Sequence, residues 1–496
     1  MAFYLCFSIT FSIVFLSSVF RDGSVEYKLN HIITFVLMII QLFIWYYLYK
    51  LIVKVFKQVS DKAKKRLVIA TFAFIAAILI ALLLVLDVPL AWDYQVIYTH
   101  AQEKALTGHM SNIYPEYLQY FPNNICLYLI EVILFRITKM FGSTNFILAA
   151  EIFNGLLIYL SIVFTYLFCK RKMSDEKAYF SLVVTCSFAP LFLYLPVFYS
   201  DTFSIVCVPL LLYISSFIDM KKKRKKAERK KQIINNILLM ILVSLVAFGG
   251  LKIKMTIIFV VIGIFADFFI KYGIKKTCEF ASIFIVIYFV FSGILNHLTY
   301  NHYYVNDYGK IPISHWIMMG LEDPDVDNSE RNAYGGYSKR DYDITLSYPT
   351  GEKSKARHIK EIRMRLKKYS FLELCDYYDK KIVNTWGDGS YLSLIKLRKN
   401  NSNRGPIKKV IIGDDKYKTL IYFEQGVQLA MLLILVFSGI YSFKNKDKEN
   451  IALHVAVLGV FCFLLIWETR SRYLYNYIPI FVMIVVSYID KLKIAK

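Results

Sequence analysis

The feature that most constrains this chain is a series of apolar runs, each long enough to cross a lipid bilayer. About 20 apolar residues span the hydrocarbon core, and residues 66–86, RLVIATFAFIAAILIALLLVL, form one such run. Of the 496 residues, 57% are hydrophobic. The sequence therefore predicts an all-α polytopic membrane protein, a bundle of about twelve transmembrane helices with two outer loops that carry interfacial helices. The expected spans are 2–20, 31–53, 67–86, 145–168, 179–198, 202–219, 233–250, 254–271, 279–297, 421–442, 451–467 and 475–490.

The distribution of basic residues predicts the orientation of these spans. The net charge is +23, and lysines and arginines cluster beside the apolar runs, most densely in KKKRKKAERKK at 221–231. Cytoplasmic loops of membrane proteins carry an excess of Lys and Arg. We therefore expect a multi-pass protein of the cell membrane with both termini in the cytoplasm. Membrane lipids, and not nucleic acid, are the expected partner of this charge. The eight cysteines include no C-x-x-C pair, so they predict neither a zinc site nor a disulfide framework.

The number of spans places two long loops on the outer side. Residues 121–141, FPNNICLYLIEVILFRITKMF, are apolar enough for a span, but a span here would move the basic segment 170–177 outside. We therefore expect an amphipathic helix at the outer membrane interface, with Glu131, Arg136 and Lys139 on one side. The expected division is N-terminal transmembrane helices at 1–86, a first outer loop at 87–144, a transmembrane core at 145–297, a large outer loop at 298–420 and C-terminal transmembrane helices at 421–496.

The large outer loop contains one strongly helical stretch. Residues 353–386 have few turn residues, and an apolar stripe with charges around it follows the helical period. The stripe consists of Ile359, Ile362, Leu366 and Leu372.

Charged residues gather at the outer ends of the expected spans, where a carboxylate is costly unless it is paired or used. Cations can hold a phosphate and a carboxylate can take up a proton, so such a collection suits a lipid phosphate as substrate. Four separated segments supply the candidates, which are Asp93, Asp201, Lys252, Lys254, Arg470 and Arg472.

Each candidate also has a purely structural alternative. Asp93 and Asp201 could cap the helices that follow them, and Asp87 could cap the end of its span. The lysines and arginines could extend to the lipid headgroups. The functional interpretation is favoured only because all these acidic and basic residues are expected on the same side of the membrane.

Seven short segments follow one another along the chain in a recognisable order. They are WDYQVIYTHAQE (92–103), YFPNNICLYLIEVILF (120–135), YSD (199–201), LKIKMT (251–256), HWIMMGL (315–321), NTWGDGSY (384–391) and SRYLYNYIP (471–479). Their order resembles that of GT-C membrane glycosyltransferases, which include the protein O-mannosyltransferases and the lipid A aminoarabinose transferases, and in particular a bacterial cell-envelope branch. Two positions depart from the family pattern, because Tyr94 follows Asp93 where a second acid is usual, and Asn123 and Asn124 stand where a lysine is often found.

The resemblance implies an inverting glycosyltransferase that moves a sugar from a polyprenyl-phosphate donor to an extracytoplasmic acceptor. The acceptor would be a cell-wall polysaccharide, a teichoic acid, a glycolipid or a protein. Asp93 would be the general base, and Asp201 would hold a divalent cation, Mg or Mn, or orient a cation. The implied substrate-binding residues are Lys252, Lys254, Arg470, Arg472, Asn123, Asn124, His315 and Trp386, with Trp316 and Tyr337 as further candidates for stacking on sugar.

Two other classes of function stay open at this point. A polysaccharide polymerase or ligase would rely on residues of the large loop such as Arg331, Arg340 or His358. A flippase or transporter of lipid-linked glycans would place charges in the middle of the membrane. Of the charged or titratable residues, Asp267 and His454 lie within apolar runs.

Overall fold

The computed structural model describes residues 1–22, 27–86, 88–220, 226–303, 308–324, 333–398 and 414–492, and within these ranges it contains helices and no strand. In this part of the chain, eight helices are long and apolar enough to cross a membrane, and two shorter ones are also apolar. The prediction of an all-α membrane protein is confirmed. The main bundle helices are α1 (Ala2–Phe20), α2 (His31–Gln58), α3 (Asp61–Val85), α7 (Phe146–Lys172), α12 (Lys226–Ile253), α13 (Ile258–Tyr303), α21 (Asp414–Asn445), α22 (Ile451–Ile466) and α23 (Ile478–Tyr488).

Polar side chains at the membrane surface start several of these helices. The Asn30 side chain accepts hydrogen bonds from two backbone N–H groups of α2, and Ser60 accepts one from α3. Ser174 caps α8 (Asp175–Ser187) in the same way. Such caps satisfy N–H groups that have no partner inside a helix, so these helices begin where the apolar runs meet polar loops.

The helical pattern departs from the expected spans at three places. The expected span 179–198 is broken, because α8 ends before Pro190 and the short helix α9 (Ala189–Leu193) follows. The expected span 202–219 is divided between α10 (Ser200–Phe203) and α11 (Cys207–Ser215). Conversely, 254–271 and 279–297 are joined in α13, where Gly273 alone leaves the helical conformation, with φ 78°. A glycine tolerates this left-handed backbone and so allows a sharp bend without a loop.

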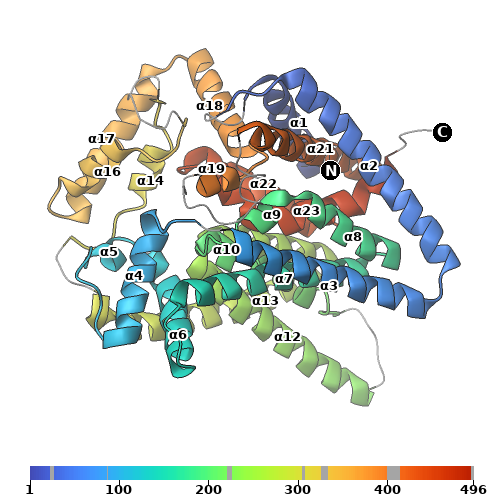
Figure 1. Cartoon of the computed structure of the whole chain (residues 1–496), viewed down its shortest axis with the longest axis horizontal. Helices are drawn as coiled ribbons and strands as arrows, with labels where there is room; N and C mark the ends of the chain where they lie inside the picture. The colour runs from blue at the N-terminus through green and yellow to red at the C-terminus, as the bar shows by residue number, and fades with distance from the viewer. Residues whose placement is uncertain are drawn as a thin grey trace.

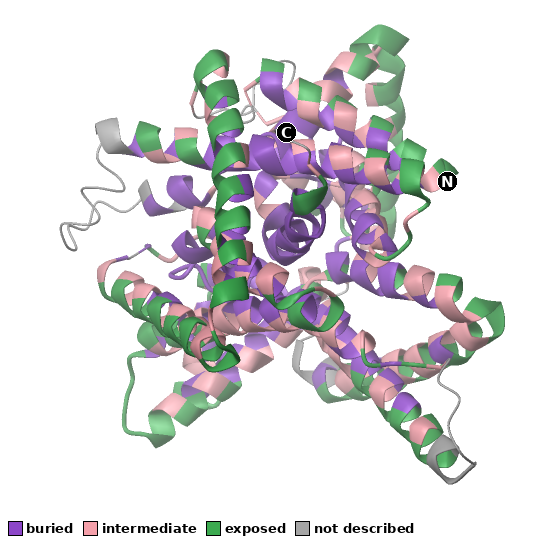
Figure 2. Ribbon diagram, turned by 90° about the vertical axis from the view of Figure 1, so that its right-hand side faces the viewer, coloured by how far each residue is buried: buried purple, intermediate pink, exposed green. Residues whose placement is uncertain are grey.

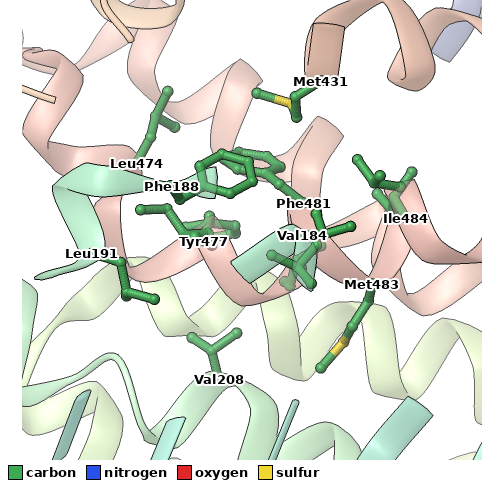
Figure 3. Packing of buried hydrophobic residues seen from close by; sticks show 14 of the residues in the cluster. Val184, Phe188, Leu191, Val208, Met431, Leu474, Tyr477, Phe481, Met483 and Ile484 are labelled. Carbon is green, nitrogen blue, oxygen red and sulfur yellow. The ribbon is translucent and has the colours of Figure 1, made fainter. Parts of the chain in front are cut away.

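The helices α23 and α21 are the most buried of the long apolar helices, and α3 is the most exposed. Figure 2 shows the buried residues gathered in the middle of the molecule. Figure 3 shows Tyr477 and Phe481 from the C-terminal segment beside Phe188, with Leu474 and Met431 among the neighbouring apolar side chains. Between apolar helices in lipid, close packing of this kind is a main source of stability. It fixes the C-terminal segment against the broken helices α8 and α9.

The helices of the two long loops lie together at the left of Figure 1, at one end of the bundle. Backbone and ring contacts join the loops: Ile311 N–H donates to the Tyr120 carbonyl oxygen at 3.1 Å, and the Phe121 ring contacts Trp316. We call this the loop end of the bundle. The first loop carries α4 (Trp92–Thr107), α5 (Tyr117–Tyr120), η1 (Pro122–Asn124) and α6 (Ile125–Met140), and the large loop carries α14 (Ser314–Met319), α16 (Lys339–Leu346), α17 (Gly351–Lys368), α18 (Phe371–Trp386) and α19 (Ser393–Arg398).

Three helices of the loops bury a different face from the one that the sequence predicts. In α6, Glu131 does not share an exposed side with Arg136 and Lys139, because it is fully buried in the apolar cluster that α6 forms with α4. In α17 and α18, the predicted apolar stripe is largely exposed, and Leu372 is 76% exposed. The buried face of α17 consists of Ser354, His358 and Glu361.

Candidate functional site

Three of the predicted site residues meet at the loop end of the bundle. The Asp201 carboxylate lies 2.6 Å from Lys254 Nζ and 3.2 Å from Arg472 Nε. Asp201 is almost completely buried, whereas 14% of the Lys254 side chain and 17% of the Arg472 side chain are exposed. Two cations share one carboxylate here, so the cluster has an excess of one positive charge that a ligand can reach.

Breaks in helices bring Asp201 and Lys254 together. Asp201 lies in the first turn of α10, and the Thr202 hydroxyl accepts a hydrogen bond from the backbone N–H of Tyr199. Lys254 has an extended backbone between α12 and η2 (Met255–Ile257). A residue at such a break can aim its side chain along the bundle surface, since no following helical turn covers it.

Arg472 is held in place by tyrosines of its own segment, η3 (Ser471–Tyr477). The Tyr477 hydroxyl donates to the Thr256 carbonyl oxygen at 2.6 Å, and the Tyr475 hydroxyl donates to the Leu191 carbonyl oxygen at 2.9 Å. The Lys254 amine lies 4.5 Å from the centre of the Tyr473 ring. The segment is therefore tied both to α9 and to the turn that carries Lys254.

Asp93 is connected to this ion cluster by Tyr199. The Tyr199 hydroxyl donates to Asp93 Oδ2 at 3.1 Å, while the Arg472 guanidinium lies 5.5 Å from the centre of the Tyr199 ring. Burial and the nearby Asp93 carboxylate raise the pKa of Tyr199 well above its usual value, so this hydroxyl stays protonated and donates. Asp93 itself is exposed. An accessible carboxylate and a partly accessible pair of cations thus lie on two sides of one tyrosine.

A second tyrosine approaches Asp93 from the first loop. The Tyr117 side chain lies near Asp93, and burial, followed by the nearby Asp93 charge, raises the pKa of Tyr117 well above its usual value. Asn124 Nδ2 donates to this hydroxyl at 2.7 Å, and Asn123 Nδ2 donates to Asn124 Oδ1 at 3.1 Å. The two asparagines therefore reach Asp93 indirectly, through Tyr117.

The backbone before Asp93 is unusual. Trp92 has φ 51°, in the left-handed region that residues with a side chain rarely adopt. Asp93 makes no capping hydrogen bond, because α4 has Ala91 at its N-cap and no side-chain cap. The capping alternative for Asp93 therefore does not apply, and the backbone strain at Trp92 accompanies the turn of Asp93 toward Tyr199. Strain of this kind tends to occur at functional sites.

Asp388 is a residue of this region that the sequence analysis did not single out. Its carboxylate is buried and accepts hydrogen bonds from the hydroxyls of Tyr27 at 2.6 Å and Ser471 at 2.6 Å. Ser471 stands directly before Arg472, so Asp388 fixes the turn from which Arg472 extends. Tyr199, Tyr117 and Asp388 all lie within or near the quoted segments, but nothing in their spacing marks them as partners.

The remaining predicted site residues lie elsewhere. The Lys252 amine faces the rings of Tyr288 and Phe248, at 5.1 and 5.6 Å, and does not join the Asp201 cluster. Trp386 is buried among Phe11, Phe461 and Phe481, so its side chain is not available to stack on a sugar. Arg470 precedes Ser471 at the start of η3.

His315 and His358 hold the large loop together. His315 Nδ1 lies 2.6 Å from the Thr345 hydroxyl oxygen, and His358 Nε2 lies 2.9 Å from the same oxygen. Burial lowers the pKa of His315 to about 3 and that of His358 to about 4. Both side chains are therefore neutral and enclosed, which suits loop packing.

Trp316 stacks on Trp467 with ring centres 5.5 Å apart.

The donor atoms do not fit the divalent cation that the resemblance implies at Asp201. Both carboxylate oxygens already face cations. Within the described ranges, no group of three or more His, Cys, Asp or Glu side chains could hold a metal ion. Two positions named in the sequence analysis, Asp87 and Arg331, lie outside the described residues.

Comparison with known proteins gives a family and a distant structural similarity. A family model described as "Conserved hypothetical integral membrane protein" matches residues 1–492. No curated protein matches the chain. The chain is similar to the crystal structure of ArnT from Cupriavidus metallidurans bound to undecaprenyl phosphate, with 11% sequence identity and a TM-score of 0.35, over 87% of this chain and 78% of that chain.

Proposed function

We propose a glycosyl transfer for this chain, which belongs to the family of conserved hypothetical integral membrane proteins. The donor would be a sugar on a polyprenyl phosphate, and the acceptor a hydroxyl of an extracytoplasmic polysaccharide, teichoic acid, glycolipid or protein. The observation that carries the proposal is the arrangement at the loop end: the ion cluster of Asp201, Lys254 and Arg472, joined through Tyr199 to the exposed carboxylate of Asp93.

The excess positive charge of the ion cluster suits the leaving group. When the sugar leaves, the lipid phosphate gains negative charge, and fixed cations stabilise that charge most where water is scarce. Lys254 and Arg472 are partly exposed, so a phosphate oxygen can bind them while Asp201 keeps them in place. Hydrogen bonds between such cations and phosphate are among the strong ones in proteins.

Asp93 would act as the general base. Its carboxylate takes the proton of the acceptor hydroxyl while that oxygen bonds to the anomeric carbon. The bond between this carbon and the phosphate oxygen breaks at the same time, and its electron pair stays on the phosphate. The hydrogen bond from the Tyr199 hydroxyl to Oδ2 fixes the direction of this carboxylate. Attack from the side opposite to the phosphate inverts the configuration of the sugar.

The other two classes of function receive no comparable support. His358, a candidate of the polymerase or ligase class, is buried and bonded to Thr345 and Ser314. Of the charges that a transporter would need within the membrane, Asp267 is paired with Lys271 at 2.5 Å. His454 is buried and bonded to Ser438 and to the Asn450 carbonyl oxygen. These groups are engaged in local structure.

The test combines genetics with a direct assay. Deletion of the gene should remove one sugar linkage from the cell envelope, and linkage analysis of envelope glycans would identify it. The purified protein should then transfer that sugar from its polyprenyl-phosphate conjugate to the acceptor. Asp93→Asn should lower the rate at least about 100-fold, since general-base help is typically worth about 10²–10⁴-fold. Glu103→Gln, on the same helix α4, is the matched control and should leave the rate unchanged.

Two results would contradict the proposal in different ways. Full activity of Asp93→Asn would remove the base while leaving glycosyl transfer intact. An unchanged envelope after deletion, together with no transfer from polyprenyl-phosphate sugars, would remove glycosyl transfer itself. Because the donor atoms around Asp201 do not fit a divalent cation, we also expect transfer to continue in the presence of EDTA.

A further inference from the structure

A polar cavity lies at the other end of the bundle from the proposed glycosyl-transfer site. Its volume is about 850 Å³, and it is lined by the ends of α7 and α21, by the part of α13 before Gly273, by the start of α22 and by the end of α23 with the residues that follow it. The helix α13 starts beside Lys254, and Asp267 and Lys271 of the same helix line this cavity. Lys271 follows Lys254 by 17 residues, so at a helical rise of about 1.5 Å per residue these two lysines, one in each site, lie roughly 25 Å apart.

Lysines from two sides of the bundle face this cavity. Lys172 ends α7, and its ammonium group is close enough to Lys271 for the two charges to repel each other. The carboxylate between them, Asp267, is already bound to Lys271 at 2.5 Å. Among the described residues no carboxylate forms an ion pair with Lys172. The wall between α7 and α13 therefore carries one uncompensated positive charge.

The opposite wall has a net negative charge, because Lys177 and Lys491 face three carboxylates, those of Asp447, Glu449 and Asp490. Lys177 donates to Asp490 at 2.9 Å and to the Ser487 carbonyl oxygen at 3.0 Å. The acidic residues Asp447 and Glu449 lie on the turn before α22. Ser215 and Ser216, at the end of α11, also line the cavity, and Arg171 Nε donates to the Ser216 carbonyl oxygen at 3.1 Å, so the end of α11 lies against the end of α7 that carries Lys172. An anion would therefore bind near Lys172, away from the acidic turn.

We propose that this cavity binds a phosphate group, with Lys172 and Lys271 as its cationic ligands. Basic pockets between transmembrane helices on the cytoplasmic side bind the headgroups of anionic lipids, and the charge of the flanking loops predicts that this end is cytoplasmic. The phosphate belongs either to such a headgroup or to a soluble phosphate compound, and both present the same tetrahedral oxygens to the lysines. The proposal is independent of glycosyl transfer.

The experiment measures binding by the full-length protein. The purified protein is placed in phosphatidylcholine nanodiscs with or without phosphatidylglycerol, and bound lipid is counted by native mass spectrometry while the melting temperature is recorded. A second series adds inorganic phosphate to protein in a neutral detergent. Lys172→Gln should weaken binding about fivefold or more, as expected for the loss of about 1 kcal/mol per lysine. Lys170→Gln, an exposed lysine on the same helix end outside the cavity, is the matched control and should bind like wild type.

The double variant Asp267→Asn/Lys271→Gln protects the test against misfolding. It removes the ion pair as a unit, so it creates no new unpaired charge, and it should also weaken binding because Lys271 is lost. Retention of phosphatidylglycerol with no effect of inorganic phosphate identifies a lipid headgroup, and stabilisation by inorganic phosphate identifies a soluble ligand. Equal binding by wild type and Lys172→Gln, or no binding of either probe, would overturn the proposal.

Discussion

The Asp201 carboxylate stabilises two cations, Lys254 and Arg472, in a largely buried site. Its carboxylate is 2% exposed and neutralises one of the two charges of Lys254 and Arg472. A buried ion pair contributes little compared with an apolar packing of the same shape, but loss of one member leaves an uncompensated charge. In this cluster two cations would be left facing each other, so Asp201 is required for the stability of the site as well as for its charge.

Replacement of Asp201 by Asn should therefore lower the free energy of unfolding by about 3 kcal/mol, at the lower end of the range for breaking a buried pair because both cations are partly exposed. Unfolding of the purified protein in increasing concentrations of SDS, followed by tryptophan fluorescence, would measure the change. Asp343→Asn removes a carboxylate from an exposed pair with Lys339 and should change the free energy by less than about 1 kcal/mol. Equal effects of the two variants would show that the Asp201 cluster is not desolvated.

The helices of the large loop are joined by polar contacts in place of the apolar stripe that their sequence suggests. Thr345 of α16 contacts both His315 of α14 and His358 of α17, and His358 Nδ1 also lies 3.0 Å from the Ser314 hydroxyl oxygen. Because both imidazoles are buried, their neutral forms are part of the folded loop. The protonation state of two side chains thus controls how firmly three helices are held together.

The stability of this loop should consequently fall as the pH falls. The pKa of His315 is lowered to about 3 and that of His358 to about 4, whereas an exposed histidine titrates near 6.5. Between about pH 6.5 and pH 4 the unfolded loop binds protons that the folded loop does not, so each histidine removes up to about 1.4 kcal/mol of stability per pH unit.

Hydrogen exchange of the amides in α14, α16 and α17, recorded from pH 7 to pH 4.5 and corrected for intrinsic exchange, would measure this loss. In His358→Gln the dependence on pH should be about half as steep. The variant His109→Gln changes an exposed histidine of the first loop and should keep the wild-type dependence. If protection of the three helices does not vary with pH in the wild type, the two histidines are not linked to folding.

For the whole molecule, the sequence determines which residues are near the loop end better than it determines where each side chain points. Runs of apolar residues and the charges at their ends are sufficient to predict the helical bundle and to propose that Asp201, Lys254 and Arg472 meet. Lys252 lies in the last turn of α12 and Lys254 lies in the extended break after it, and the sequence does not show that the helix ends between them, so it cannot tell which of the two lysines faces Asp201.

Burial is the other quantity that the sequence leaves open. The residue pattern of α6, which carries Glu131, and that of α17 are helical whichever face packs inward. Which face is buried depends on the helix that lies against each of them. An aromatic residue such as Trp386 is equally compatible with a sugar site and with the core. The break before Pro190 could be read from the sequence, since the residue before a proline disfavours the helical conformation. Its consequence, the placing of Tyr199 beside Asp93, depends on tertiary contacts.

The orientation of the bundle connects all these sites, and native cysteines can test it. Cys375 of α18 is exposed in the large loop, and Cys278 of α13 is exposed just after Gly273. The charge of the flanking segments predicts that the first lies outside the cell and the second in the cytoplasm. In variants that keep only one cysteine, a membrane-impermeant maleimide should label Cys375 in intact cells and Cys278 only after permeabilisation. The reverse pattern would place Asp93 and Lys254 in the cytoplasm, where no extracytoplasmic acceptor could reach them, whereas the ion cluster and its stability would be unaffected.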